Sequence, residues 1–467
     1  MCITYTTKST QLSKPSLRAP AEELCASAKQ SHLSNPSLRA PAVGACVSAK
    51  QSHLSKNTCI PHPSKKQPKY LTSSIIEIQA DNKFFSTQSI CFITLIITSI
   101  LIFLISCQTK PAENTRTQIA DTVSIKYATG FKVTYDGNIK WVEVNYPYQG
   151  ATSGYHYVLV PKGDAVPVHG NGTQVITIPL ESIVCTSTTH IPLLDYINET
   201  NKLTGFPTTD YISSEKMRKR VDDGKVVDLG IDKGMNLEKL FVLQPSVVMG
   251  YAMSGDLGQL KKVQEMGMPV IINAEYLEKH PLGRAEWIKF VALFFNKEKT
   301  ADSVFQVIET EYTKTTKLAL QTQVKPTVIS GVVYGDAWFM PGGQNYAARL
   351  LKDAGCAYLW ADDTSQGFLE LSFESVYAKA KEADLWIGVG SFLSLKEIKD
   401  AEDRYSKFKP WQQKAVFTYN ARKGAKGGSE FLELGYARPD LILKDLVKIA
   451  HPDLLPDYEL YFHKKLE

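Results

Sequence analysis

Residues 237–250 read LEKLFVLQPSVVMG, and residues 373–390 read FESVYAKAKEADLWIGVG. Each stretch predicts a short helix with one glutamate near its start, followed by a polar turn and a buried strand that ends in glycine. A carboxylate in the first helical turn is stabilised by the partial positive charge there and needs no partner in the same chain. We therefore expect two similar α/β lobes that present Glu238 and Glu374. The pattern alone leaves open that these are ordinary helix-start glutamates.

The rest of the chain is consistent with such lobes and adds a β-rich segment before them, at 123–178. Residues 131–135 and 139–144 alternate between apolar and polar side chains, with the hairpin turn Asp136-Gly137-Asn138 between them. Residues 155–160 and 175–178 continue this pattern. Strands alternating with helices then predict an N-terminal lobe over 180–281 and a C-terminal lobe over 322–467.

A helical connection is predicted between the two lobes, at 282–321. No glycine or proline occurs between Gly283 and Pro326, and residues 296–299 indicate a break between two helices. A helix over 298–321 would be roughly 36 Å long. That length is enough to run from one lobe to the other.

An apolar run at 90–106 follows Lys83 and ends in Leu104-Ile105-Ser106-Cys107. A short apolar core after a basic residue is typical of a secretory signal. The last four residues resemble a bacterial lipobox, which predicts a lipoprotein signal over 90–107, a lipid on Cys107 and a polar tether over 108–122. The alternative is a single membrane anchor, although the run is at the lower limit for spanning a bilayer. Both interpretations place the remainder of the chain on the same side of the membrane.

The segment 1–89 differs from the rest of the chain. SLRAP occurs at 16–20 and again at 37–41, and AKQSHLS occurs at 28–34 and again at 49–55. The segment is basic, rich in serine and proline, and too poor in apolar residues to form a core, so we expect it to be disordered. There is no methionine between Met1 and Met217. This favours the hypothesis that translation starts further downstream, at a non-methionine codon near 75–83.

Charge and cysteine content exclude several classes of protein. The formal charge of +5 comes largely from the basic first segment, and the near balance of the remainder argues against nucleic-acid binding. Cys185 and Cys356 fall in different predicted lobes, so we expect two buried thiols and no disulfide. No cysteine or histidine cluster has the spacing of a zinc site.

Several ordered motifs resemble one protein family. They are IVCTSTT at 183–189, GMNLE at 234–238, QPSVV at 244–248 and GYARPDLILKDL at 435–446. This set resembles the periplasmic binding proteins of ABC importers for iron–siderophore complexes, haem and cobalamin. HPLGRAEWIKF at 280–290 is similar to the form found in Bacteroidetes lipoproteins of this group. The resemblance extends from about residue 180 to the C terminus.

The resemblance implies a fold and a function. The fold would be α/β, with two Rossmann-like lobes joined by a long helix as a clamshell, here with a β-rich N-terminal extension. The ligand, an iron chelate such as a siderophore or haem, or cobalamin, would lie between the lobes. Matched by position, Glu238 and Glu374 would each contact the transmembrane subunits of the ABC permease. The chain would act as a lipid-anchored, periplasm-facing monomer in the cell envelope, with no cofactor of its own.

Ligands of open α/β sheets bind beyond the carboxyl ends of the strands. Flat aromatic walls suit a large planar or macrocyclic ligand, and arginines can bind its carboxylates or phosphates. The predicted ligand-binding residues are Thr188, Thr189, His190, Tyr251, Arg284, Tyr334, Trp338, Phe339, Tyr419 and Arg422. Among these, His190 can ligate haem iron or corrin cobalt, although a helix-start histidine is more often hydrogen-bonded. The glycine-rich stretch 424–429 lacks phosphate-loop spacing, and we expect it to be a mobile loop at the mouth of the cleft.

Two other functions remain as alternatives. An anchored extracytoplasmic enzyme is disfavoured because the chain has no Gly-x-Ser-x-Gly elbow and no His-Glu-x-x-His motif. His451 and His463 have no nucleophile near them in the sequence. A surface binding protein that works with an outer-membrane receptor is also compatible with a lipid anchor.

Overall fold

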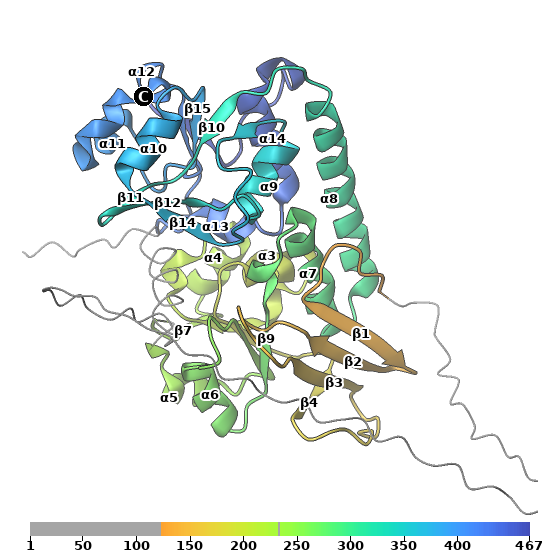
Figure 1. Cartoon of the computed structure of the whole chain (residues 1–467). Coiled ribbons are helices and arrows are strands. Elements are labelled where there is room, and N and C mark those ends of the chain that lie inside the picture. Colours follow the sequence, from red (N-terminus) through yellow and green to blue (C-terminus); the bar gives the residue numbers. More distant parts are fainter. Residues whose placement is uncertain (1–122, 232–233) are drawn as a thin grey trace, which may run out of the picture. The chain divides into compact units, whose positions relative to one another are not determined.

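The computed structural model describes residues 123–231 and 234–467 (Figure 1). The predicted signal at 90–107 with its predicted lipidation site Cys107, the predicted tether at 108–122 and the repetitive segment 1–89 all lie outside these residues. Within the described part of the chain, none of the helices combines the length and the apolar character needed to cross a bilayer.

The first element is a four-stranded sheet in the order β1-β2-β3-β4. Its strands are β1 Phe131–Asp136, β2 Ile139–Val144, β3 Tyr155–Pro161 and β4 Thr173–Ile178. The β1–β2 hairpin forms at the predicted turn, where Gly137 has a positive φ that favours glycine. β3 and β4 pair in parallel, so the sheet is more than a simple meander.

The N-terminal lobe is built on a parallel sheet in the order β7-β6-β5-β8-β9. The strands are β5 Ile183–Cys185, β6 Leu203–Phe206, β7 Val227–Asp228, β8 Val247–Gly250 and β9 Val270–Ile272. The helices of this lobe are α3 His190–Tyr196, α4 Glu215–Asp222, α5 Leu237–Leu243 and α6 Gln259–Glu265. The strand order reverses beside β5, as in a doubly wound fold.

Two helices connect this lobe to the next, α7 Pro281–Leu293 and α8 Glu298–Ala319. The break falls where the sequence predicted it, with Asn296 in the left-handed region at φ 56°. The long helix ends two residues earlier than expected. It packs against α7 toward one end and against α14 toward the other (Figure 1). The ion pair from Lys444 Nζ to Glu311 Oε2, at 2.6 Å, joins α8 to the C-terminal lobe.

The C-terminal lobe contains two sheets. The larger has the order β13-β10-β15-β16-β17, with only the edge strand β17 antiparallel, and the smaller is the antiparallel β11-β12-β14. Their strands are β10 Thr327–Ile329, β11 Val332–Tyr334, β12 Ala337–Pro341, β13 Ala357–Tyr358, β14 Phe368–Leu371, β15 Leu385–Ile387, β16 Val416–Thr418 and β17 Lys464–Lys465. The helices are α9 Tyr346–Asp353, α10 Phe373–Ala380, α11 Leu395–Ala401, α12 Lys409–Gln412, α13 Glu430–Leu434 and α14 Pro439–Ala450. The predicted fold class, two α/β lobes joined by a long helix, is confirmed.

Two buried carboxylates, Glu286 on α7 and Glu278 just before it, hold the segment that precedes β1. Glu286 accepts hydrogen bonds from the backbone N–H groups of Lys126, Tyr127 and Ala128 at 2.6–3.0 Å. Glu278 accepts two more, from the N–H groups of Thr129 and Gly130 at 2.8 and 2.7 Å. A carboxylate that replaces water for several backbone donors keeps those groups satisfied in the interior. The motif GRAEW at 283–287 therefore joins the β-rich extension to the connecting helix.

Cys185 and Cys356 are both buried free thiols, as the sequence predicted. Burial raises the pKa of the Cys185 thiol and raises that of Cys356 to about 12. Both therefore remain protonated and packed as small apolar side chains.

Candidate functional site

The candidate ligand site of the N-terminal lobe is the place where its strand order reverses, between the loops that follow β5 and β8. The Thr186 N–H donates to the Met249 carbonyl at 3.1 Å, which fixes the ends of these two strands side by side. Loop 186–189 leaves toward α3, whereas the chain after β8 continues to α6 and β9. In open α/β sheets ligands bind at this position.

Thr189 links the β5 loop to the chain after β9. Its hydroxyl donates to Glu275 Oε1 at 2.5 Å. Glu275 is buried, and burial raises the pKa of its carboxyl group. Its second oxygen has no hydrogen-bond partner among the described residues, and neither does the side-chain amide nitrogen of neighbouring Asn273. Buried polar atoms are normally paired, so these two atoms are available to a bound molecule or water.

His190, the first residue of α3, is also buried without partners. Only 1 % of its surface is exposed, and neither ring nitrogen has a hydrogen-bond partner within the described part of the chain. Burial lowers the pKa of the imidazole to about 3, so the ring is neutral at physiological pH. A neutral imidazole can accept a hydrogen bond or ligate a metal. The expected metal ligation stays a prediction.

Arg284 packs against two aromatic rings of the C-terminal lobe, which are tilted toward each other with their centroids 5.7 Å apart. Its guanidinium carbon is 3.8 Å from the ring centroid of Tyr346 on α9 and 4.2 Å from that of Tyr436. It also donates to the carbonyls of Tyr276 and Glu278 at 2.8 and 3.0 Å. Stacking on aromatic faces suits the planar guanidinium. Arg284 therefore connects α7 to the C-terminal lobe, beside the buried Tyr346 hydroxyl, for which the described residues offer no partner.

A buried carboxylate, Glu433, joins the two lobes, and we call this contact the latch. Glu433 on α13 accepts hydrogen bonds from the backbone N–H groups of Ser213 and Ser214, both at 2.7 Å. Ser214 is the N-cap of α4, so the carboxylate lies at the positive end of that helix. Burial raises the pKa of Glu433 to about 7, against the hydrogen bonds from Ser213 and Ser214, which lower it, and with a smaller contribution from the charge of Asp195.

The glycine-rich stretch 424–429 packs against the same part of the N-terminal lobe. A Cβ added to Gly428 would lie 2.1 Å from the Tyr211 carbonyl oxygen, and one added to Gly424 would lie 2.6 Å from the Ser213 Cα. These glycines allow two backbones to approach closely. The loop is therefore part of the contact between the lobes, and its expected mobility stays a prediction.

The latch gives a testable pH dependence. The pKa of Glu433 in the folded protein lies above its ordinary value of 4.5, so folding favours the protonated acid. This contribution to the free energy of unfolding is fully present below pH 4.5 and is lost as the pH rises toward 7. The glutamine in Glu433→Gln stays neutral at every pH. We therefore expect the free energy of unfolding of this variant to fall less than that of the wild type as the pH rises from about 5 to about 8. Urea titrations of both proteins measure the difference, and parallel pH profiles would contradict it.

Two other predicted residues, Tyr419 and Arg422, lie beside α13. Arg422 Nε donates to Glu430 Oε2 at 2.9 Å, and its guanidinium stacks on Tyr461 at 4.4 Å. Tyr419 stacks on Phe431 at a centroid distance of 4.5 Å. Since α13 also packs against α3, these side chains and Thr188, Thr189 and His190 lie on elements that contact one another. Tyr251 follows β8 directly and is half-buried.

Trp338 requires a correction. It is fully buried, and its indole N–H donates to the Ser330 carbonyl at 3.0 Å. Its ring packs among Phe373, Trp386, Tyr405 and Phe408. A turn forms at Gly335-Asp336 and is exposed, but the tryptophan that follows it lies inside β12 and faces the core. Phe339 is also buried, and Tyr334 packs against it, edge to face.

Glu238 and Glu374 occupy equivalent positions in the two lobes. Each is exposed and lies in the first turn of its helix, α5 or α10. The N-cap side chains Asn236 and Ser372 accept hydrogen bonds from the N–H groups of Lys239 and Ser375. The predicted exposure and helix positions are confirmed. Their contact with a permease stays a prediction.

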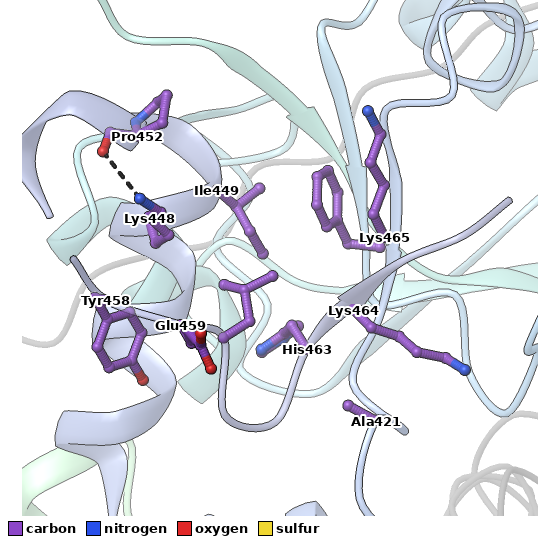
Figure 2. A pocket seen from close by; sticks show the side chains of 11 residues that line it. Ala421, Lys448, Ile449, Pro452, Tyr458, Glu459, His463, Lys464 and Lys465 are labelled. Carbon is purple, nitrogen blue, oxygen red and sulfur yellow. Dashed lines mark hydrogen bonds between the residues drawn. The ribbon is translucent and has the colours of Figure 1, made fainter. Parts of the chain in front are cut away.

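A cavity of about 620 Å³ lies elsewhere, between α14 and the C-terminal tail (Figure 2). His463 lines it, and its Nδ1 lies 2.9 Å from Asp445 Oδ2. Asp445 also accepts hydrogen bonds from the N–H groups of Tyr461, Phe462 and His463. Among the described residues around this cavity there is no serine, threonine or cysteine. This histidine is therefore part of the hydrogen-bond network that holds the tail on α14.

Sequence reasoning did not find Glu433, Tyr346 or Tyr436. Glu433 contacts residues about 220 positions away, and no local pattern marks such a contact. The glycines at 424 and 428 were the available signal, since glycine in a loop also indicates close backbone approach. No group of three or more His, Cys, Asp or Glu side chains within the described residues could hold a metal ion.

Comparison with known proteins identifies one family and two related lipoproteins. The family model for periplasmic binding proteins matches residues 183–422. Two uncharacterized lipoproteins of Methanocaldococcus jannaschii are similar to the chain. One is 27% identical over 370 residues, covering 74% of this chain and 86% of the relative. The other is 25% identical over 358 residues, covering 73% and 87%.

Solved structures with the same kind of fold include the periplasmic heme-binding protein RhuT from Roseiflexus sp. RS-1. It is 16% identical, with a TM-score of 0.44 over 59% of this chain and 99% of that one. A periplasmic binding protein from Veillonella parvula is 14% identical, with a TM-score of 0.48 over 69% and 95% of the two chains.

Proposed function

The chain belongs to the family of periplasmic binding proteins, and from this premise we propose that it captures a metal chelate and delivers it to the transmembrane subunits of an ABC permease. Proteins of this family are transport components without enzymatic activity, so an extracytoplasmic enzyme is excluded. The proposed ligand is an iron chelate, either a siderophore complex or haem, or cobalamin.

The observation that carries the proposal is the pair of exposed first-turn glutamates. Glu238 and Glu374 follow N-caps of the same kind and precede buried strands of two similar sheets. A docking partner with two cationic pockets would pair with both carboxylates at once. Such a pair has no evident role in the stability of either lobe, because exposed carboxylates contribute little to folding.

The polar and charged side chains around the candidate ligand site would suit a polar, partly anionic ligand. Thr189, Glu275 and the neutral His190 supply donors and acceptors, and Arg284 and Arg422 supply positive charge. The carboxylates of a haem or the polar periphery of a siderophore would find complementary groups there. The latch at Glu433 would then have to open for the ligand to enter or leave.

The proposal includes a lipid anchor on Cys107. The sequence LISC at 104–107 supports it, as do the names of the two similar archaeal lipoproteins. An anchor would hold the binding protein close to its permease and raise the effective concentration of one for the other.

Calorimetric titration of the purified chain with haem, cobalamin and a ferric siderophore tests the ligand. Calorimetry is preferable to tryptophan fluorescence because Trp338 and Trp386 lie in the core. We expect one of the three ligand classes to bind. Thr189→Val removes the hydrogen bond to Glu275 at the candidate ligand site and should raise the Kd for that ligand about tenfold. Thr310→Val, on α8 and bonded only to its own helix, is the matched control. Absence of heat from all three, together with no co-purified ligand by mass spectrometry, would exclude the metal-chelate proposal.

A further inference from the structure

One face of α5 exposes two large apolar side chains beside Glu238. Phe241 and Val242 are 57 % and 83 % exposed. They follow Glu238 at i+3 and i+4, so all three side chains project from the same face of the helix. Among the described residues none forms a hydrogen bond or ion pair with the Glu238 carboxylate. The opposite side of α5 packs through Leu240, which is buried.

The equivalent face of α10 has a different character. Counted from the N-caps, Tyr377 corresponds to Phe241 and Ala378 to Val242. Tyr377 is half-buried, stacks on Phe373 and packs edge to face against Phe408. Ala378 is exposed but small. The face of α10 therefore exposes little apolar surface around Glu374.

Glu374 also has a cation beside it within its own lobe. Arg404 Nη1 donates to Glu374 Oε1 at 2.8 Å. Its other nitrogens form a two-point contact with Glu402, also at 2.8 Å, and its guanidinium stacks on Phe373 at 4.0 Å. Arg404 therefore contacts Glu374, Glu402 and the ring of Phe373 at the same time. A cationic pocket that approaches Glu374 meets this arginine as well.

We propose that the two halves of the permease-docking surface are unequal, with the α5 face of Glu238, Phe241 and Val242 forming the dominant contact. The partner is the extracytoplasmic surface of the permease, with a cationic pocket for Glu238 surrounded by apolar side chains for Phe241 and Val242. The α10 half forms the weaker contact because Arg404 competes for Glu374. This inference rests on the proposed function and assigns unequal roles to its two carboxylates.

The physical basis is the removal of water around one ion pair but not the other. Apolar side chains that surround a charged contact exclude solvent and strengthen it, as in interface hot spots. An exposed phenylalanine and valine also gain free energy directly when they are covered. On α10 Glu374 already has a cationic partner in Arg404, so a cation of the permease would gain less from pairing with it than with Glu238, which has no such partner among the described residues.

The test compares docking of full-length variants to the permease reconstituted in nanodiscs. Phe241→Ser with Val242→Ser is expected to raise the Kd roughly tenfold or more while the ligand affinity stays unchanged. The matched control is Val307→Ser with Leu320→Ser, two exposed apolar residues, on α8 and at its C-cap. Arg404→Gln is expected to lower the Kd about threefold by freeing Glu374.

The outcomes separate this inference from the proposed function. If the serine pair docks like the wild type while loss of both glutamates impairs docking, the unequal surface is overturned and the docking function stands. If neither change affects docking, the docking function itself fails. If analytical ultracentrifugation shows a dimer of the wild type that the serine pair abolishes, the α5 face contacts a second copy of the chain and the inference is overturned.

Discussion

Replacing Glu238 and Glu374 together by alanine is expected to reduce uptake through the permease roughly 100-fold or more, because each charge loses its cationic partner on the permease. Ligand affinity and the free energy of unfolding should remain close to those of the wild type. Both carboxylates are exposed, and the Glu374–Arg404 pair lies at the surface, where ion pairs contribute little. Uptake of labelled ligand in cells, together with calorimetry and urea unfolding of the purified variant, measures all three quantities.

The matched control removes one exposed carboxylate from each lobe at other positions. Glu265, at the end of α6, and Glu382, after α10, are both exposed. The double variant Glu265→Ala with Glu382→Ala has the same change of net charge and should transport normally. Each single variant at 238 or 374 should lose part of the uptake, with the larger loss at 238. Wild-type transport by the first double variant would mean that both residues are ordinary helix-start glutamates.

Glu286→Gln is expected to destabilise the whole described fold by about 3–5 kcal/mol, the range for removing one partner from a buried charged network. The carboxylate is fully buried, accepts three backbone N–H groups and lies 3.1 Å from Lys289 Nζ. A glutamine has one acceptor in place of two and brings an N–H₂ group toward backbone donors. Lys289 would also lose its buried counter-charge. Urea denaturation measures the loss, and hydrogen exchange should show faster exchange at 126–128.

Glu311→Gln provides the comparison on the neighbouring helix. Its carboxylate pairs with Lys444 but is partly exposed, so its loss should cost at most about 1 kcal/mol. If both glutamine variants unfold at the same denaturant concentration, the buried carboxylate does not hold the N-terminal sheet on α7. In that case the packing of Phe131 and Trp287 would be the main contact between the extension and the lobe.

Much of the fold could be predicted from short-range patterns. The alternation at 131–135 and 139–144 with Gly137 between them produced the β1–β2 hairpin. The absence of glycine and proline after Gly283 predicted α8 to within two residues of its end. The exposure of Glu238 and Glu374 also followed from local features, because a first-turn carboxylate beside an N-cap is determined by a few consecutive residues.

The candidate ligand site was harder to predict because its residues come from distant segments. Trp338 at the end of a polar turn looked like an exposed aromatic, yet four rings from elsewhere in the C-terminal lobe surround it. The burial of His190 depends likewise on elements far along the chain.

The sequence by itself determined the two α/β lobes, the helix that joins them, the β-rich extension and the positions of the two exposed glutamates. Periodicity, caps and turns act over a few residues, so they are visible in the order of the amino acids. Only the tertiary structure decided that Arg284 packs against Tyr346 and Tyr436, that Glu433 accepts hydrogen bonds from Ser213 and Ser214, and that Arg404 pairs with Glu374. These contacts join side chains from separate segments, and their geometry depends on how the whole core packs.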